Sequence, residues 1–316
     1  MSALDPELAE ALRDLPDGPA LGADSLPAIR AALRENNPGC AEAVGERDLV
    51  WEDRLVPGAD VAVTVLRPRV LTPGAPGFYN IHGGGMVMDD RFADLPRMVG
   101  LVEEFGFVAV TVEYRLAPEH PHPAPIEDCY AGLAWMADNA AELGFDPAKL
   151  VVGGGSAGGG LSAGVALLAR DRGGPALAGQ LLLCPMLDDR NDSPSTVEYG
   201  DSGVWTRAGN AFGWHSLLDG QTSEYAAPAR ATDLAGLPPA FIEVGAVEIF
   251  RDEDIDYARR LWQAGVPAEL HVWAGAYHGF DRFAPTAEVT KAALAARSSW
   301  LRRVLGATGP GVIGSA

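Results

Sequence analysis

The sequence predicts an α/β fold with a mostly parallel eight-stranded sheet flanked by helices. Short apolar runs with strand character alternate along the chain with helical patterns, an order that is typical of βαβ units. A hydrophobic content of 47% and a charged content of 21% are those of an ordinary globular protein. A chain of 316 residues can bury one large core or divide in two, and we expect a single domain over residues 1–316.

The expected elements follow one another in a regular order. Two short strands near Leu49–Trp51 and over Val61–Leu66 are expected to form an antiparallel start to the sheet. The later strands are predicted at Phe78–Ile81, Val108–Val112, Leu150–Val152, Leu181–Cys184, Phe241–Val244 and Leu270–Trp273. The helices between and after them are predicted at Ala93–Phe105, Ile126–Leu143, Leu161–Arg170, Asp252–Ala264 and Ala287–Leu305.

Two segments interrupt this alternation and are expected to form a helical cap. They are residues 1 to about 45, which have a helical pattern, and residues 186–225, an insertion of a size that is usually functional. The catalytic core would then comprise about 46–185 and 226–306. In the second segment Trp205, Phe212 and Trp214 either line a substrate pocket or pack in the core. The tail that begins at Thr308 is expected to lack a fixed structure.

Charge and cysteine usage exclude several classes of protein. A net charge of −19 argues against nucleic-acid binding, because phosphates would be repelled. Cys40, Cys129 and Cys184 are far apart and odd in number, so they form neither a disulfide framework nor the paired spacing of metal ligands. Cys129 and Cys184 are expected to be core thiols. The N-terminus has no secretory-signal pattern, which favours a cytoplasmic location.

The uncharged stretch Leu150–Ala169, LVVGGGSAGGGLSAGVALLA, is long enough to suggest a membrane span. Six of its first eleven residues are glycine, which disfavours a helix, so we expect no span. Gly153, Gly155 and Gly158 also match the dinucleotide fingerprint G-x-G-x-x-G. The acidic residue that this fingerprint requires about twenty positions later is missing, and we expect no cofactor.

The same stretch contains Gly154-x-Ser156-x-Gly158, the pattern of a nucleophile elbow, in which a strained turn raises a serine hydroxyl above the sheet. Upstream, His82-Gly83-Gly84-Gly85 follows the strand Phe78–Ile81, where an α/β-hydrolase has its oxyanion loop. Glycines there let backbone N–H groups face a developing oxyanion. Ala157, after the serine, adds an N–H group at the start of a helix whose dipole favours the same charge.

With these motifs the chain resembles the hormone-sensitive-lipase-like branch of the α/β-hydrolase esterases. The resemblance rests on His82–Gly85, on Y-R-L-A-P-E-H-P at Tyr114–Pro121, on Gly154–Gly159 and on Y-H-G-F at Tyr277–Phe280. It implies an α/β-hydrolase fold and a serine carboxylesterase that needs no cofactor or metal. The expected substrates are small-molecule esters with a short acyl chain or a small aromatic group, cleaved through an acyl-enzyme. The block Tyr114–Pro121 is expected to shape the region under the oxyanion loop.

The resemblance also implies roles for single residues. Ser156 would be the nucleophile, and Gly84, Gly85 and Ala157 would donate to the oxyanion, with Gly83 fixing the loop. His278 follows the last strand and matches the family's base, which gives the chain order serine, acid, histidine. The other five histidines (His82, His120, His122, His215 and His271) are expected in the oxyanion loop, the proline-rich block, the cap and a strand.

The triad acid is less clear, because the chain departs from the family there. The family has D-P-L-x-D-E where this sequence has E-I-F-R-D-E, which places Glu248 at the acid position. Asp252 is the alternative, although it opens the helix Asp252–Ala264 and is expected to cap it. A second departure is Gly155, where the family usually has aspartate, so elbow rigidity or substrate range is in question.

Other functions remain open on the same fold. Relatives of this kind include specialised biosynthetic hydrolases, amidases and dehydratases, and a hormone receptor of this fold binds its ligand without turning it over after loss of the catalytic histidine. His278 in its matching context argues against a pure binding role. Relatives often pair through the last strand, so a homodimer through Leu270–Trp273 is expected.

Overall fold

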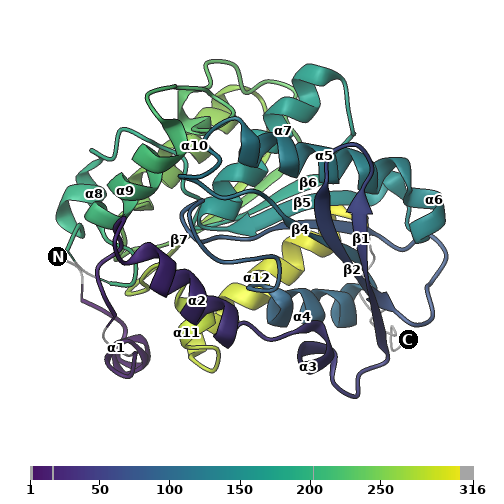
Figure 1. Ribbon diagram of the computed structural model, residues 1–316, viewed down its shortest axis with the longest axis horizontal. Helices are drawn as coiled ribbons and strands as arrows, with labels where there is room; N and C mark the ends of the chain where they lie inside the picture. Colours follow the sequence, from purple (N-terminus) through teal and green to yellow (C-terminus); the bar gives the residue numbers. More distant parts are fainter. Residues whose placement is uncertain (1–2, 16–17, 202, 307–316) are drawn as a thin grey trace, which may run out of the picture.

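The computed structural model describes residues 3–15, 18–201 and 203–306. The C-terminal tail, which was predicted to lack a fixed structure, lies outside these residues. One eight-stranded sheet crosses the molecule in the order β1-β2-β4-β3-β5-β6-β7-β8 (Figure 1). The strands are β1 (Leu49–Val56), β2 (Val61–Pro68), β3 (Gly77–Ile81), β4 (Val108–Glu113), β5 (Leu150–Gly155), β6 (Gly179–Leu183), β7 (Ala240–Gly245) and β8 (Ala268–Trp273). All eight lie where the sequence predicts them.

Strand direction also follows the prediction. β1 pairs antiparallel with β2, and β2 pairs antiparallel with β4. Every other pair in the sheet, from β4-β3 to β7-β8, is parallel. The carboxyl ends of β3, β5, β7 and β8 therefore meet at one edge of the sheet, where ligands bind in open α/β sheets.

Helices cover both faces of the sheet. They are α1 (Pro6–Arg13), α2 (Leu26–Asn36), α3 (Cys40–Val44), α4 (Leu95–Phe105), α5 (Ala124–Asp138), α6 (Ala140–Leu143), α7 (Ala157–Arg172), α8 (Pro194–Glu198), α9 (Arg207–Leu218), α10 (Arg251–Gln263), α11 (Phe280–Phe283) and α12 (Glu288–Val304). α5, α7 and α10 pack on one face, and α3, α4 and α12 pack on the other (Figure 1). Successive residues of a strand point to opposite faces of the sheet, so each face has its own hydrophobic core. In β4, Val110 faces α5 and α7, whereas Ala109 faces α4 and α12.

One helix that was predicted to be continuous is divided. The pattern over residues 126–143 forms α5 and α6, which meet at Asn139. The side-chain amide of Asn139 donates to the carbonyl of Trp135 at 2.7 Å, inside the last turn of α5. Asparagine competes in this way with the helical backbone, and apolar periodicity does not register such a break.

The glycine-rich stretch forms β5 and the first turns of α7 rather than one continuous helix. α7 begins at Ala157, four residues before its predicted start at Leu161. Close packing explains why glycine is tolerated in this first turn: a Cβ on Gly158 would lie 2.0 Å from the carbonyl oxygen of Ile81. Within the described ranges, no helix combines the length and apolar character that a membrane span requires.

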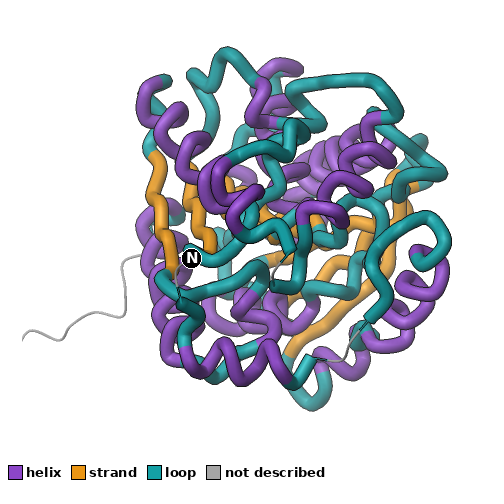
Figure 2. The backbone as a smooth tube through the Cα atoms, turned by 90° about the vertical axis from the view of Figure 1, so that its left-hand side faces the viewer, coloured by secondary structure: helices purple, strands orange, loops and turns teal. Residues whose placement is uncertain are grey.

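The two predicted cap segments approach each other beyond the strand ends. α1 and α2 come from the first segment and α8 and α9 from the second, and they gather at the left of Figure 1. Figure 2 faces this side and shows helices and loops in front of the strand ends. A Cβ on Gly209 of α9 would lie 3.8 Å from the side chain of Leu21, so the two segments are in contact. α3, by contrast, packs against α4 and β1.

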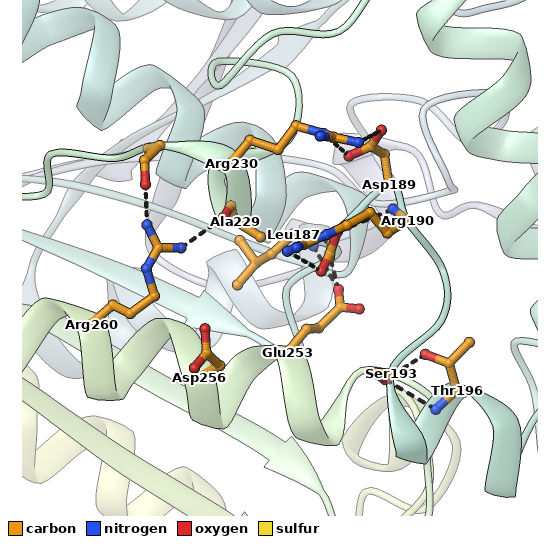
Figure 3. A network of polar contacts seen from close by, with 12 residues as sticks. Leu187, Asp189, Arg190, Ser193, Thr196, Ala229, Arg230, Glu253, Asp256 and Arg260 are labelled. Carbon is orange, nitrogen blue, oxygen red and sulfur yellow. Dashed lines mark hydrogen bonds and ion pairs between the residues drawn. The ribbon is translucent and has the colours of Figure 1, made fainter.

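The chain that leads from β6 into the second segment is anchored to α10 (Figure 3). Glu253 Oε1 accepts from the backbone N–H groups of Leu187 and Asp188, at 2.9 and 3.2 Å. Burial raises the pKa of the Glu253 carboxyl well above its ordinary value. Nearby, Arg230 binds both carboxylate oxygens of Asp189. These contacts fix the start of the segment that covers the sheet edge.

Candidate active site

Ser156 occupies a sharp turn between β5 and α7. Its φ of 57° and ψ of −126° lie in a region that non-glycine residues rarely adopt, and holding it there costs about 1–3 kcal/mol. Two backbone bonds hold the turn in place: Ser156 N–H donates to Leu183 O at 2.8 Å, and Met186 N–H donates to Ser156 O at 3.0 Å. The hydroxyl is presented at the carboxyl edge of the sheet, where the residue is partly exposed.

His278 and Glu248 approach Ser156 from the two neighbouring turns. His278 lies after β8 and Glu248 after β7, and both are buried, with 8% and 3% of their surfaces exposed. Ser156 Oγ lies 2.9 Å from His278 Nε2, and His278 Nδ1 lies 2.5 Å from Glu248 Oε2. The other oxygen of Glu248 accepts the N–H of Gly245 at 2.7 Å. Serine, imidazole and carboxylate thus form one hydrogen-bonded line.

The electrostatics favour a charged His278. Burial alone disfavours the imidazolium, but Cys184 and Glu248 outweigh it and raise the pKa of His278 well above 6.5. Burial raises the pKa of the Cys184 thiol, so this thiol is neutral at neutral pH. Glu248 contributes to the raised pKa of His278 both through its charge and through its hydrogen bond to Nδ1. An imidazolium that forms during a reaction would be stabilised by the same contact.

Asp252, the alternative acid, lies in a different network. Its Oδ2 accepts the N–H of Ser195 in α8 at 2.8 Å, and its Oδ1 accepts from Arg251 Nε at 2.8 Å. The prediction that Asp252 caps the helix is wrong, because α10 begins at Arg251 with Phe250 in the capping position. Asp252 ties α8 to α10, and it is Glu248 that contacts His278.

The oxyanion loop, His82–Gly85, follows β3 and lies against the elbow. A Cβ on Gly83 would lie 3.0 Å from Gly155 O. The hydroxyl of Tyr114 is 3.0 Å from His82 O and 3.1 Å from Gly83 O, and the Tyr114 ring stacks on His82 at 4.2 Å. Tyr114 belongs to the Y-R-L-A-P-E-H-P block, which therefore lies beneath this loop as expected.

Gly84 needs to be glycine. Its φ of 96° is closed to other residues, and a Cβ would lie 2.2 Å from Met88 O. In the part of the chain that the structure describes, no acceptor is assigned to the N–H groups of Gly84, Gly85 or Ala157. Ala157 is the first residue of α7, where the helix dipole favours negative charge. These three N–H groups are therefore candidate donors to an oxyanion.

Arg30 of α2 fastens the first cap segment to this loop, and sequence reasoning missed it. Its Nε donates to Val87 O at 2.6 Å and its Nη2 to Ala117 O at 2.7 Å. The same guanidinium binds Glu119 at 2.8 and 2.9 Å. Two of the three groups that Arg30 binds are backbone carbonyls, and a backbone carbonyl leaves no pattern in the sequence.

The remaining histidines lie in the elements expected for them. His120 is exposed, and His122 donates its backbone N–H to Leu217 O at 2.6 Å. His215 is exposed on α9. His271 of β8 stacks between Phe241 and Trp273, at 5.2 and 5.1 Å.

Gly155, the departure in the elbow, lies beside Arg97. A Cβ at this position would be 3.4 Å from Arg97 Nη1. Arg97 forms an ion pair at 2.7 Å with Asp94, the residue that precedes α4. The guanidinium beside the elbow therefore has a carboxylate partner although Gly155 supplies none.

The three cap aromatics have different surroundings. Trp205 packs on the oxyanion loop, since a Cβ on Gly85 would be 2.5 Å from its ring, and its Nε1 donates to Asn210 at 3.1 Å. Trp214 lines a separate cavity of about 700 Å³ that no triad residue lines. Phe212 is half-buried and packs against the main core. Of the three, Trp205 is the residue that contacts the candidate site.

Cys184 meets its expectation in part. Cys129 is fully buried as predicted, and Cys184 is half-buried and packs against the main core. The backbone at Cys184 has a φ of 38°, which turns the chain sharply after β6. Its Sγ and the ligand atoms of Glu248 and His278 all lie within 4.8 Å of one another.

The fold and this site define an α/β hydrolase. A family model described as "alpha/beta hydrolase fold" matches residues 78–282. Carboxylesterase NlhH of Mycobacterium tuberculosis is 38% identical over 252 residues, with 75% of this chain and 77% of that protein covered. The solved structure of a bacterial heroin esterase superposes with a TM-score of 0.89 at 38% identity, over 96% of this chain and 98% of that one.

Esterase LipW from Mycobacterium marinum gives a similar result, with a TM-score of 0.88 at 34% identity over 95% and 96% of the two chains. The chain belongs to the hormone-sensitive-lipase-like carboxylesterases of the α/β-hydrolase superfamily.

Proposed function

We propose that this carboxylic-ester hydrolase works through Ser156, His278 and Glu248. The observation that carries the assignment is the continuous line from Ser156 Oγ to His278 Nε2 at 2.9 Å and from His278 Nδ1 to Glu248 Oε2 at 2.5 Å. Such a line lets the imidazole take a proton from the serine while the carboxylate holds the required tautomer.

The proposed reaction has two halves. Ser156 Oγ attacks the ester carbonyl as its proton passes to His278 Nε2, and the imidazolium then gives this proton to the departing alkoxide. A water molecule, deprotonated by His278, cleaves the acyl-enzyme and releases the acid. In both tetrahedral intermediates the N–H groups of Gly84, Gly85 and Ala157 bind the oxyanion, with Gly83 holding the loop against the elbow. Loss of one such donor costs about 10²–10³ in turnover.

We propose esters with a short acyl chain or a small aromatic group as substrates. α9 lies directly on the oxyanion loop, since a Cβ on Gly213 would be 2.9 Å from Gly85 O. Trp205 covers the same glycine from the cap. Both contacts restrict the space on this side of Ser156, which disfavours a long chain there.

The cap and the oligomeric state form part of the same proposal. Residues 1–45 and 186–225 would be a cap over a core of 46–185 and 226–306, although α3, at the end of the first segment, packs against α4 and β1 of the core. β8 ends the sheet and has an unpaired edge, through which two copies would pair as a homodimer. A cytoplasmic location remains a prediction from the sequence.

Hydrolysis of p-nitrophenyl esters of increasing chain length tests the function. We expect turnover of the acetate and butyrate, weak turnover of the palmitate, and loss of nearly all activity in Ser156→Ala. Ser162→Ala is the matched control: this serine lies on α7 and its hydroxyl bonds only to Gly158 O, one turn earlier, at 2.7 Å. A preference for the palmitate would contradict the proposed substrate size. Full activity in Ser156→Ala would contradict the proposed mechanism.

A further inference from the structure

Cys184 brings a third kind of metal ligand to the side of the triad. Within the described part of the chain, Cys184, Glu248 and His278 are the side chains whose candidate ligand atoms come close enough together to hold a metal ion. The thiol comes from the end of β6, between the strands that carry Ser156 and Glu248. Cys184 is partly exposed, whereas Glu248 and His278 are buried.

We propose that these three residues form an inhibitory site for a thiophilic divalent cation such as Zn²⁺. Thiolate, imidazole and carboxylate are the ligands that Zn²⁺ prefers, whereas Mg²⁺ and Ca²⁺ select oxygen ligands. Binding needs a thiolate, so the ion displaces the Cys184 proton to solvent as the Zn–S bond forms.

Ligand spacing makes metal binding and the intact triad mutually exclusive. Two ligand atoms on one tetrahedral zinc ion lie about 3.5 Å apart, given zinc–ligand bonds of roughly 2.0–2.3 Å. His278 Nδ1 and Glu248 Oε2 are only 2.5 Å apart, so both cannot bind the same ion until their hydrogen bond is broken. If the ion binds Nδ1, the imidazole proton moves to Nε2. If the ion binds Nε2, it occupies the lone pair that would accept the serine proton.

The backbone around the cluster is held firmly enough for such a site. Cys184 N–H donates to Glu243 O at 2.6 Å, which fixes the left-handed turn to β7. Glu248 Oε1 keeps its hydrogen bond from Gly245 N–H, at 2.7 Å, while Oε2 turns to the ion. Only side-chain movements of about 1 Å are then needed to bring the three ligand atoms from within 4.8 Å of one another to zinc spacing.

The first experiment measures inhibition of p-nitrophenyl butyrate hydrolysis by ZnCl₂, with each protein compared with its own metal-free rate. Wild type should be inhibited, and EDTA should restore its rate. Cys184→Ser should need at least about tenfold more Zn²⁺, since even changes outside the ligand shell cost 10–100-fold in metal affinity. Cys40→Ser removes a buried thiol outside the cluster and should be inhibited like wild type. MgCl₂ should not inhibit.

The second experiment detects the metal without using activity. The kinetic effect rests on the proposed role of His278, but binding does not, so Co²⁺ is added to the Ser156→Ala protein. A thiolate–cobalt charge-transfer band should appear in the near ultraviolet, and it should be missing from Ser156→Ala with Cys184→Ser. Equal zinc inhibition of Cys184→Ser and wild type, no inhibition of wild type, or no cobalt band would each overturn the proposal. If wild type is an active esterase but its Ser156→Ala variant shows no cobalt band, the metal site alone is refuted. A cobalt band in Ser156→Ala, combined with a wild-type protein that has no esterase activity, refutes the proposed function alone.

Discussion

Replacement of Glu248 by glutamine tests the proposed acid of the triad. Two donors face the Glu248 carboxylate in the structure: Gly245 N–H at 2.7 Å and His278 Nδ1 at 2.5 Å. A glutamine side chain has one oxygen and one NH₂ group, so it satisfies only one of these donors. If the NH₂ group faces His278, Nδ1 must lose its hydrogen, Nε2 becomes protonated, and it no longer accepts the proton of Ser156.

The opposite orientation is disfavoured, because it leaves buried donors without a partner. With the glutamine oxygen on His278, the NH₂ group faces Gly245 N–H, and a buried donor without a partner costs about 1–3 kcal/mol. We expect the side chain to keep the Gly245 bond and to impose the inactive tautomer. The same exchange in a Ser-His-Asp triad lowers kcat by about 10⁴, or about 5 kcal/mol at 1.36 kcal/mol per tenfold. Glu248→Gln should therefore lose about 10³–10⁴ in kcat for p-nitrophenyl butyrate.

Two further variants separate this explanation from general damage. Glu248→Asp keeps the charge but is about 1.5 Å shorter, so one of its two hydrogen bonds is lost, at a cost of about 10–100-fold. Asp252→Asn is the matched control, because Asp252 bonds to Ser195 and Arg251 and should change kcat less than about threefold. Melting curves by circular dichroism report whether each variant is folded. A folded Glu248→Gln with more than a tenth of wild-type activity would refute the assignment, as would a larger loss in Asp252→Asn.

Three other predictions follow from the same geometry. His278 must be neutral to act as a base, so kcat/KM should rise with pH, and the midpoint of this rise should lie above 6.5. In the residual activity of Glu248→Gln the midpoint should be lower. An unchanged midpoint would contradict the electrostatic explanation. Gly84→Ala, with its Cβ 2.2 Å from Met88 O, should reduce kcat by at least about 10² without preventing folding, and near-normal kcat would show that the loop is not rigid. Asp254 is fully buried, and no described residue forms a hydrogen bond with its carboxylate. Burial raises the pKa of this carboxyl well above 3.8, and the nearby acidic groups raise it further. The folded state therefore holds this proton longer than the unfolded state, and stability falls as pH rises from the unfolded pKa towards the folded one. Asp254→Asn should thus stabilise the fold by about 1–3 kcal/mol at pH 8 and by less near pH 4, as measured by urea unfolding, and no gain at pH 8 would contradict this.

The sheet could be predicted from sequence because its signal is local. Most strands contain a short apolar run, and the alternation with helices favours parallel pairings. Helix ends were less well predicted, since they depend on single contacts: Asn139 divides α5 from α6 through one amide, and Gly158 allows α7 to start early through close packing on β3.

The site divides in the same way. Ser156 and Gly83–Gly85 lie in short contiguous motifs, and the structure brings both together with His278 and Glu248. Cys184 packs against the core as predicted, but the left-handed turn at this residue after β6 is not indicated by apolar periodicity. Arg30 escaped notice because its backbone partners lie 57 and 87 residues away in the chain.

The central claim is that Ser156 is the nucleophile of an ester hydrolase, and covalent labelling tests it most directly. The protein is inactivated with phenylmethylsulfonyl fluoride, its intact mass is measured, and the adduct is located by peptide mapping. We predict one adduct per chain, on Ser156, with activity lost in proportion to labelling. An adduct on another residue that accounts for the inactivation, or full esterase activity in Ser156→Ala, would contradict the claim.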